Sequence, residues 1–439
     1  MSELPSEWKI KALGDVVEKI VGGGTPSKNN ASYFRGNIPF MTVKDMKTSR
    51  PKGTIDNITE EALENSSSKL IEPNTLIIST RMGLGKIVKV KFPVAINQDL
   101  KALYLSDDVY QKFFEYQYQY KAPEIEALGT GTTVKGIRLE TLKKIEMVFA
   151  PLEEQKRIAD KLDSVLAKVE AAQARLDKIP AILKRFRQSV LAAATSGELT
   201  KEWRGNEKYR DETLNWSITK IPESWDLKFL EEVAESRLGK MLDKSKNSGI
   251  ATEYLGNINL RWHHIDLSEL KEILVSQKEI DELNIRDGDL LLCEGGEPGR
   301  GAVWKGGDNN LVFQKAIHRV RCTDCISPEF LLYCIEDDFF SNRLSLLYTG
   351  TTIKHLTGKA LKKYPVRIPP IAEQMEIVRR VNSLLEASSK IEEQYLAAKL
   401  RVNQLTQSIL KKAFEGELLT SEVENEFLQE LSDVEAVEC

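Results

Sequence analysis

The chain has 439 residues, with 62 Lys and Arg against 66 Asp and Glu and a formal net charge of −4 at pH 7. This length is enough for about three domains with cores of their own, and the charge excludes nucleic-acid binding through a uniformly basic surface. The sequence begins without a basic segment and apolar core and has no uninterrupted apolar run of membrane-spanning length, so we expect a cytoplasmic protein.

Residues 1–150 combine short apolar runs with glycine-rich turns. Leu76-Ile77-Ile78 is one such run, and Gly22-Gly23-Gly24 is one such turn. Runs of this length bounded by turn residues are typical of strands mixed with short helices. We predict a mixed α/β domain built around a curved β-sheet.

Residues 151–200 are predicted to form a long helix, with a start signal at Pro151 and a stop signal at Gly197. Pro180 lacks an amide hydrogen, so we expect it to kink or interrupt the helix. Apolar residues recur at steps of four and three, the spacing of a heptad seam. The seam comprises Ile158, Leu162, Val165, Val169, Ala172, Leu176, Ile179, Leu183, Phe186, Val190 and Ala193. Its 36 residues correspond to roughly 54 Å of straight helix.

The second half of the chain repeats the first. The sequence T-G-T-T-V-K at residues 130–135 recurs as T-G-T-T-I-K at residues 349–354, and the same offset of 219 relates Pro151 to Pro370 and Glu154 to Glu373. Two copies of one unit predict approximate two-fold symmetry. We therefore predict a second α/β domain at residues 215–369 and a second helix at residues 370–419.

The offset of 219 also predicts the seam of the second helix. Its positions are Ile377, Val381, Leu384, Ser388, Ile391, Tyr395, Ala398, Val402, Leu405, Ile409 and Lys412. Ser388 and Lys412 are the two that do not suit a buried seam. Two matching helices in one chain pack most simply as an antiparallel coiled coil with a globular domain at each end. Such spacing suits a DNA site of two parts with a gap between them, since one turn of DNA is about 34 Å.

The end of the chain is acidic. From Glu415 to Cys439 there are nine Asp and Glu and no Lys or Arg. A run of like charge usually forms a solvated end. We predict a mobile acidic tail at residues 420–439, with an autoinhibitory mimic of DNA as the alternative.

Glycine-rich loops at matched positions are the candidate phosphate-binding sites. Glycine lets the backbone approach a phosphate, while Arg, Lys and Thr supply charge and hydroxyl donors. The candidates in the first half are Gly22, Thr25, Lys28, Arg81, Lys86, Thr130, Thr132, Thr133 and Lys135. Those in the second half are Arg237, Lys240, Arg300, Thr349, Thr351, Thr352 and Lys354. The Thr-Gly-Thr-Thr turns suit a structural role, joining domain to helix, equally well.

Base readout is expected from the segments in which the two halves differ. Side chains there that match base edges are Thr42, Lys44 and Gln98 in the first half, and Asn257, Asn259, Arg261, Glu297 and Gln314 in the second. Different readers predict different half-sites. We therefore expect an asymmetric DNA site.

The motifs and their order resemble those of a known family. The P-L-E-E-Q at residues 151–155, the P-I-A-E-Q at residues 370–374, the T-G-T-T-x-K turns and residues 179–198 are similar to those of the specificity subunit of type I restriction-modification systems. The resemblance covers essentially the whole chain. It implies a non-catalytic subunit that binds a bipartite DNA site with a fixed gap and docks two methyltransferase subunits and two restriction motor-nuclease subunits. It also implies that S-adenosylmethionine, ATP and Mg bind to those partners.

Motifs for chemistry within the chain are weak. The sequence has no G-x-x-x-x-G-K phosphate loop and no Asn or Asp followed by Pro-Pro and an aromatic residue. Cys322-x-x-Cys325, with His318 and Cys334 nearby, is an alternative zinc site that lacks the second paired half. The alternative is that these cysteines are buried thiols with a structural role. The five cysteines are odd in number and unevenly placed along the chain, which indicates a reducing compartment rather than a set of disulfides. His263, His264 and His355 share no catalytic motif.

Two further hypotheses concern proteins as partners. Arg185 and Phe186 belong to a basic segment that the second helix does not repeat. We consider them candidates for docking a methyltransferase subunit, and the alternative is that they belong to a solvated helix face without a partner.

The competing functions for the whole chain are a coiled-coil adaptor whose globular ends bind proteins and an enzyme that acts alone on DNA. Salt separates the classes, because DNA binding weakens steeply with salt.

Overall fold

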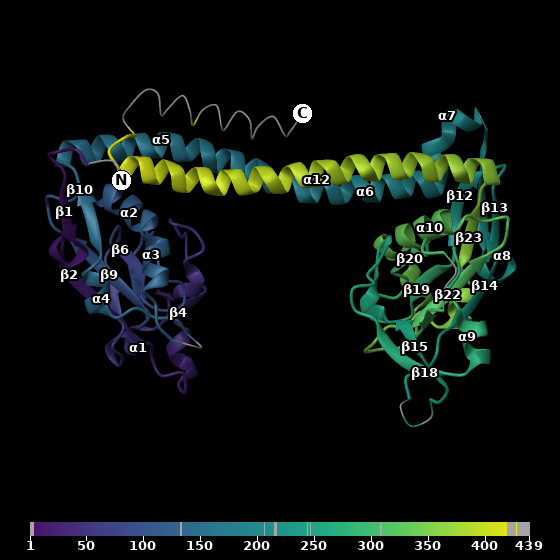
Figure 1. Ribbon diagram of the computed structural model, residues 1–439. Helices are drawn as coiled ribbons and strands as arrows, with labels where there is room; N and C mark the ends of the chain where they lie inside the picture. The colour runs from purple at the N-terminus through teal and green to yellow at the C-terminus, as the bar shows by residue number, and fades with distance from the viewer. Residues whose placement is uncertain are drawn as a thin grey trace. The chain divides into compact units, whose positions relative to one another are not determined.

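The computed structural model describes residues 4–131, 134–205, 207–214, 217–243, 245, 247–307, 310–418 and 427. The chain forms two compact units (Figure 1). Unit 1 comprises Met1–Asp177 and Gln394–Cys439, and unit 2 comprises Lys178–Glu393. Each unit contains mixed helix and strand together with part of the long helix α12 (Ile371–Phe414), which confirms the predicted mixed α/β fold class.

Two four-stranded sheets form the centre of unit 1. The first has the order β2 (Val17–Gly22), β9 (Leu100–Leu105), β6 (Leu76–Ser79), β7 (Ile87–Lys89), with every neighbouring pair antiparallel. The second has the order β4 (Asp56–Ile58), β3 (Ile38–Met41), β8 (Val94–Ile96), β5 (Lys69–Ile71), with β3 and β8 parallel. Buried side chains from both sheets, including Met41, Ile77 and Ala102, share one core.

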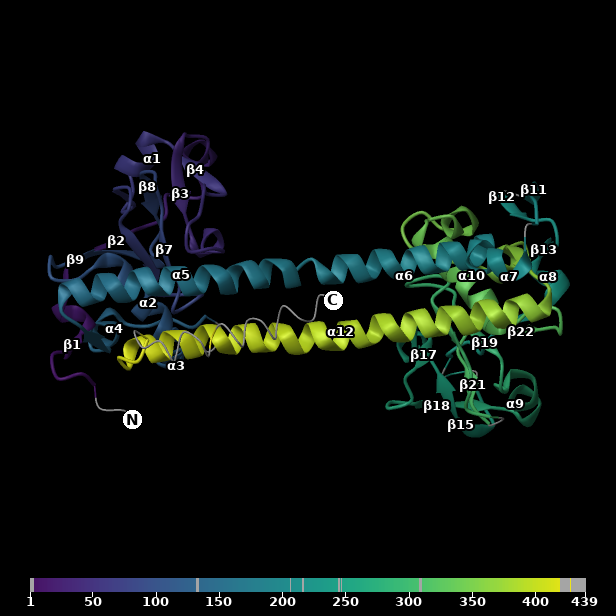
Figure 2. The same cartoon turned by 90° about the horizontal axis from the view of Figure 1, so that it is seen from above.

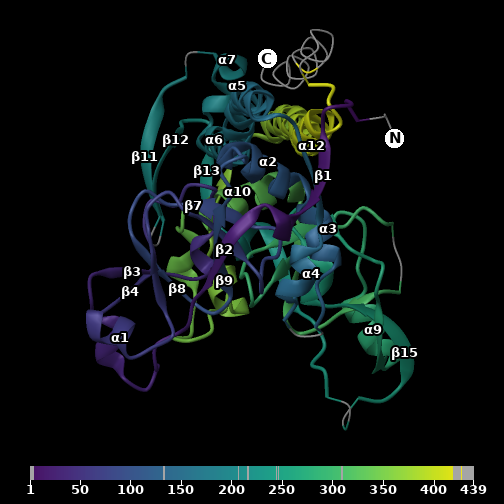
Figure 3. The same ribbon diagram turned by 90° about the vertical axis from the view of Figure 1, so that its left-hand side faces the viewer.

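The remaining elements of unit 1 connect these sheets to the long helices. Strand β1 (Lys9–Ala12) pairs with β10 (Glu146–Phe149). The helices are α1 (Glu60–Glu64), α2 (Gln111–Tyr120), α3 (Ala122–Ala127), α4 (Leu139–Lys143) and α5 (Leu152–Leu176). In the end-on view, α2 lies between the sheets and the pair formed by α5 and α12 (Figure 3).

Unit 2 repeats the topology of unit 1. Its four-stranded sheet has the order β14 (Ala234–Leu238), β22 (Ile317–Cys322), β19 (Leu290–Cys293), β20 (Gly301–Val303). A second sheet has the order β18 (Lys271–Val275), β15 (Ile250–Leu255), β21 (Val312–Phe313), with β15 and β21 parallel like β3 and β8. Strand β13 (Asp226–Phe229) pairs with β23 (Pro365–Ile368), as β1 does with β10. The repeat in the sequence is therefore a repeat of the fold.

Two hairpins and a set of helices complete unit 2. The hairpins are β11 (Tyr209–Leu214) with β12 (Ser217–Pro222) and β16 (Leu260–Arg261) with β17 (His264–Ile265). The helices are α6 (Ile179–Ser196), α7 (Lys201–Arg204), α8 (Leu230–Val233), α9 (Gln277–Leu283), α10 (Pro328–Phe340) and α11 (Gly358–Lys362). No helix in the described part of the chain is long and apolar enough to cross a membrane.

The long helices pair antiparallel inside each unit. In unit 1, α5 runs alongside the C-terminal half of α12, and Lys399 Nζ lies 3.4 Å from Asp177 Oδ1 at the end of α5 (Figure 2). In unit 2, α6 runs alongside the N-terminal half of α12, where Arg187 binds Glu392 and Arg380 donates to the carbonyl of Leu199. The predicted antiparallel helix pair is confirmed.

The break predicted at Pro180 is confirmed, and the seam departs from prediction after it. Helix α5 ends at Leu176 and α6 begins at Ile179, with Pro180 in its first turn. The seam prediction is correct from Ile158 to Leu176, where every predicted position is buried. It is wrong at Phe186, which is 39% exposed. The predicted positions Leu183 and Val190 are buried, and Leu191 and Ala194 are buried with them because α6 also packs against the core of unit 2.

The seam of α12 departs from prediction where α12 faces Arg187 of α6. Ser388 was expected to break the seam but is fully buried, and its hydroxyl accepts a hydrogen bond of 3.1 Å from Arg187 Nε. Ile391 was expected inside but is 42% exposed. Arg187 also binds Glu392 at 2.7 Å. The contact between the helices in this turn is therefore polar, with Ser388 and Glu392 facing Arg187.

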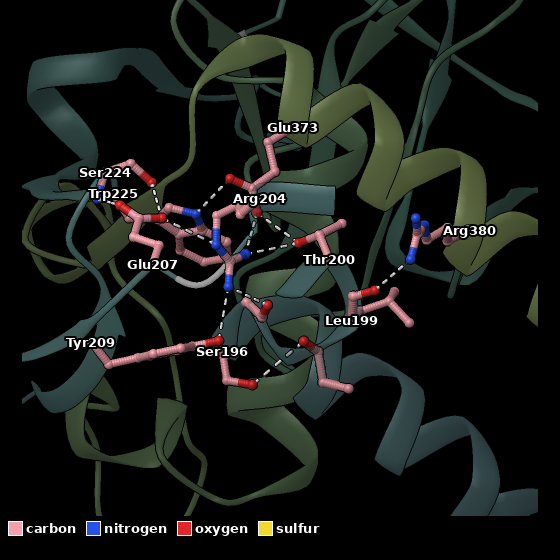
Figure 4. A network of polar contacts seen from close by, with 12 residues as sticks. Ser196, Leu199, Thr200, Arg204, Glu207, Tyr209, Ser224, Trp225, Glu373 and Arg380 are labelled. Carbon is pink, nitrogen blue, oxygen red and sulfur yellow. Dashed lines mark hydrogen bonds and ion pairs between the residues drawn. The ribbon is translucent and has the colours of Figure 1, made fainter. Parts of the chain in front are cut away.

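A tryptophan ties each domain to the start of its helix. In unit 2, Trp225 Nε1 donates to Glu373 Oε2 at 2.9 Å, and Thr200 and Arg204 bind the other oxygen of this buried carboxylate (Figure 4). In unit 1, Trp8 Nε1 donates to Glu154 Oε2 at 3.2 Å. The repeated P-S-E-W and P-E-S-W sequences thus have one structural role in both units.

Candidate nucleic-acid interface

Five loops of unit 1 meet at one end of its sheets. They are residues 22–28 after β2, 42–45 after β3, 80–86 between β6 and β7, 97–99 between β8 and β9, and 130–135, of which Thr132 and Thr133 lie outside the described residues. Backbone hydrogen bonds join them: Gly24 N to Ile96 O, Asn97 N to Met41 O, Thr80 N to Asp99 O and Met82 N to Lys135 O, at 2.8–3.2 Å. The fold thus gathers the candidate residues of the first half on one surface.

The equivalent loops of unit 2 meet in the same way. Lys240 N donates to Phe313 O, Gln314 N to Leu255 O, Glu294 N to Ala316 O and Leu356 N to Glu294 O, at 2.8–3.0 Å. The turn with Thr349 is closed by two hydrogen bonds to His355, as that with Thr130 is by two to Gly136. The sequence therefore encodes two loop clusters with one backbone design.

One glycine in each cluster is required by close backbone approach. A Cβ at Gly23 would lie 2.0 Å from the carbonyl oxygen of Ile96, and a Cβ at Gly239 would lie 2.0 Å from that of Phe313. Neither backbone oxygen can move without breaking a parallel strand pair. Gly22, the predicted candidate, meets only the flexible end of Lys101. The glycine needed by the fold is thus the neighbour of the predicted one.

The turn after the parallel strand is the same in both units. Asp45 Oδ2 accepts from Thr42 N at 2.8 Å, and Asn259 Oδ1 accepts from Gly256 N at 2.9 Å, so both side chains cap their own turn. Asn259 is 5% exposed, and its amide also donates to the carbonyls of Asp266 and Glu269. Asn259 therefore supports its turn from inside, whereas Lys44, on the equivalent turn of unit 1, is exposed.

Most predicted side chains of unit 1 reach the surface. Thr25 Oγ1 donates to Gln98 Oε1 at 2.5 Å, which links two loops, and Arg81 Nη1 lies 3.5 Å from Asp99 Oδ1. The exposed ones are Lys28, Lys44, Arg81, Lys86, Gln98, Thr130 and Lys135. Burial lowers the pKa of Lys101, which donates to the carbonyls of Gln98 and Leu100 beside them. The surface carries cations and an amide, the groups that bind phosphate and base edges.

Three basic candidates of unit 2 are bound by carboxylates. Lys240 binds Glu279, whose pKa its hydrogen bond lowers to about 2, and Arg237 binds Glu282. Arg300 binds Glu297. Glu279 and Glu282 lie on α9, and the sequence analysis missed both because 39 and 45 residues separate them from their partners. The electrostatic surface of unit 2 therefore differs from that of unit 1.

The remaining candidates of unit 2 form contacts within the loops. Asn257 Nδ2 donates to Gly295 O at 3.1 Å, Arg261 Nη1 to Ile258 O at 2.7 Å and Lys354 Nζ to Gly350 O at 2.9 Å. Gln314 is partly exposed, and its side-chain amide lies against Gly256. Thr349, Thr351 and Thr352 are exposed on their turn.

The alternative chemical sites do not assemble. Within the described residues, no three His, Cys, Asp or Glu side chains converge as metal ligands, and His318 Nε2 instead contacts the carbonyl of Leu356 at 2.7 Å. Burial raises the pKa of Cys322 and of Cys334 to about 12, which keeps both as thiols. Thiols are poor zinc ligands unless they ionise. Cys293 and Cys334 are buried, as the interpretation of buried thiols expects, whereas Cys322 is partly exposed and Cys325 is exposed.

Comparisons with known proteins give a consistent picture. A family model described as "Type I restriction modification DNA specificity domain" matches residues 5–181 and 222–399. The EcoBI specificity subunit of Escherichia coli is 34% identical over 413 residues, which cover 92% of this chain and 85% of that protein. The EcoKI specificity subunit of Escherichia coli K12 is 29% identical over 436 residues, with 95% and 90% covered.

Solved structures share the fold. The HsdS subunit from Thermoanaerobacter tengcongensis superimposes with a TM-score of 0.54 at 18% identity, over 95% of this chain and 98% of that one. A chain from a study of complex assembly and conformational transition of the type I R-M system superimposes with a TM-score of 0.66 at 17% identity, over 95% and 100%. At these identities the likeness concerns the fold.

Proposed function

The chain belongs to the family of type I restriction-modification DNA specificity subunits, and we propose that it reads an asymmetric, bipartite DNA sequence with a fixed gap. As a specificity subunit it recognises DNA sequence. In the proposal, each loop cluster reads one half-site. The observation that carries it is the pair of clusters, built on one backbone design and furnished with different side chains.

The division of roles within each cluster follows from chemistry. Cations and hydroxyls on the exposed loops suit phosphate oxygens, and exposed amides suit base edges. In unit 1 we assign phosphate contacts to Lys28, Lys86, Thr130 and Lys135 and base contacts to Lys44 and Gln98. In unit 2 we assign phosphate contacts to Lys240, Arg300, Thr349, Thr351 and Lys354 and base contacts to Arg261, Glu297 and Gln314, whereas Asn257, whose amide oxygen is buried, supports its own loop. Because Asn259 is buried, it positions the turn instead.

We further propose that the chain is non-catalytic and docks two methyltransferase subunits, with two motor-nuclease subunits joining for restriction. S-adenosylmethionine, ATP and Mg would bind to those partners. Phe186, 39% exposed on α6 beside Arg185, supports the docking role, because an exposed ring on a helix is costly in water and suits a protein interface.

The test is a methylation map. The chain is co-expressed with its neighbouring methyltransferase in a bacterial host that has no DNA methylation of its own, and modified adenines are mapped across the genome. We expect one two-part motif with a fixed gap and two different halves, absent when this chain is omitted. A soluble complex that leaves the genome unmethylated would instead favour the protein adaptor. A methylated palindrome would contradict the asymmetric site.

A further inference from the structure

A hollow of about 960 Å³ lies within unit 2, apart from the loop cluster. Helix α10 forms one wall, α6 and the N-terminal half of α12 form a second, and the turn between β16 and β17 forms a third. This volume is in the range of small-molecule sites. The proposed reading of DNA makes no use of it.

Aromatic rings line much of the hollow. The Trp262 ring lies 5.4 Å from that of Phe339 and 5.9 Å from that of Phe340, and the His263 ring lies 5.6 Å from that of Tyr333, measured between ring centres. His263 has a φ of 61°, a left-handed conformation that is strained for a side chain of this size. The turn thus holds Trp262 and His263 over α10. Aromatic faces attract cations.

One buried carboxylate of the lining is paired with no Lys or Arg in the described part of the chain. At the rim, Lys305 binds Glu329 at 3.4 Å and Arg187 binds Glu392 at 2.7 Å. Glu386, also in the lining, binds Lys390 at 2.9 Å. Glu336 is 8% exposed, and its Oε2 contacts His263 Nε2 at 2.6 Å. A cation that enters the hollow would therefore meet a buried acidic group to which His263, but no Lys or Arg, is bound.

Unit 1 carries cations of its own at the corresponding place. Tyr116 on α2 binds Asp163 on α5, and Tyr333 on α10 binds Asn382 on α12 at 2.7 Å, so the two Tyr contacts mark equivalent positions. In unit 1, Lys112 binds the same Asp163. The helix offset of 217 that relates the two Tyr residues places Glu329 at the position of Lys112.

A second cation lies close by in unit 1. Arg50 Nη2 donates to Glu115 Oε2 at 2.7 Å, and Glu115 is buried. The same offset of 217 relates Gln119 of unit 1 to Glu336 of unit 2. Each cation of unit 1 binds a carboxylate, Asp163 or Glu115, that is replaced in unit 2 by Asn382 or Leu332. The buried carboxylate of the hollow is therefore particular to unit 2, where unit 1 has an amide.

We propose that the hollow of unit 2 binds an organic cation, a guanidinium or primary ammonium group carried on an apolar stem. The positive group binds Glu336, and the stem packs against Trp262 and Tyr333. This inference does not depend on the recognition of DNA.

Isothermal titration of the full-length protein tests the proposal. The probes are capped arginine amide, its neutral isostere capped citrulline amide, and spermidine. We expect arginine amide or spermidine to bind saturably and citrulline amide not to. Glu336→Gln, which keeps the hydrogen bond to His263 and removes the charge, should weaken binding at least about tenfold, and Trp262→Leu should weaken it as well. Glu272→Gln, the same change on exposed β18, is the control and should have no effect.

Each other outcome is decisive. Equal binding of arginine and citrulline amides, or binding that survives Glu336→Gln, overturns the cation site. No saturable heat for arginine amide or spermidine up to millimolar concentration overturns it too. A folded Trp262→Leu variant with unchanged binding removes the role of the ring. If the site exists, spermidine binding more tightly than arginine amide indicates a free polyamine as its occupant, and the reverse order indicates a protein side chain.

Discussion

At the scale of single residues, two equivalent carboxylates have different surroundings. Glu373 is fully buried and is bound by Trp225, Thr200 and Arg204, whereas Glu154 is partly exposed and is bound by Trp8. A buried carboxylate that loses a hydrogen-bond donor is left without a partner, which lowers stability. Water takes the place of the lost donor at an exposed carboxylate. The same substitution should therefore have unequal effects in the two units.

We expect Trp225→Phe to destabilise unit 2 by about 1–3 kcal/mol, because Glu373 loses an indole donor that water cannot replace. Trp8→Phe, the matched control in unit 1, should cost about 1 kcal/mol or less. Urea unfolding followed by circular dichroism measures both midpoints. Equal shifts for the two variants would show that the burial of Glu373 does not matter.

The carboxylates of α9 set the charge of the second loop cluster. We expect Glu279→Gln to strengthen DNA binding a few-fold and to increase the slope of log affinity against log salt by about 1, because Lys240 is released to a phosphate. Gln retains the cap that Glu279 forms with Ser276. Asp281→Asn, on the same helix but bound to Gln277, is the control. Fluorescence anisotropy at several salt concentrations measures both, and unchanged or weaker binding by Glu279→Gln would contradict this role.

At the scale of elements, the sequence predicts what is periodic and misses what is not. The heptad spacing correctly locates the buried face from Ile158 to Leu176, since one helix keeps one phase. It fails at Phe186, because α6 packs against the core of unit 2 through Leu191 and Ala194 as well, and the heptad spacing does not predict this second contact. The repeated glycines correctly predicted matched loops in the two halves, but not that the loops of each unit gather into one cluster. Pairs such as Arg237 with Glu282 were not predicted either, because they depend on tertiary packing.

In each unit, the loop after the first strand of the four-stranded sheet passes close to a parallel strand pair. This close approach depends on one glycine. We expect Gly23→Ala to destabilise unit 1 by about 1–3 kcal/mol, because the added Cβ meets the backbone oxygen of Ile96 at 2.0 Å and forces the loop outward. DNA affinity should fall with it. Gly53→Ala, where nothing lies within 4 Å of the added carbon, is the control. Thermal unfolding and anisotropy test this, and a Gly23→Ala protein with unchanged stability would show that the loop adapts freely.

At the scale of the whole molecule, the duplication is the structural basis of our proposal that one chain reads two different half-sites. Each loop cluster is held by hydrogen bonds inside its own unit, from Thr80 to Asp99 in one and from Glu294 to Ala316 in the other. Substitutions that share no partner contribute independently to binding. The shared backbone fixes the positions of the side chains, and in our proposal the differing side chains supply two separate specificities. The sequence predicts this division but not the bases, since each base contact depends on how a loop meets the groove.

Gln98 and Gln314 test this independence. We expect Gln98→Ala to relax only the half-site read by unit 1, and Gln314→Ala only that read by unit 2, each at a cost of about 1–3 kcal/mol in discrimination, the value of one good base contact. The double variant should relax both halves by the sum of the two. Methylation maps of the three variants measure this against Gln173→Ala, a change on α5 that belongs to neither loop cluster. A single substitution that relaxes both halves would mean that the two units read DNA jointly, and the asymmetry between them would then need another cause.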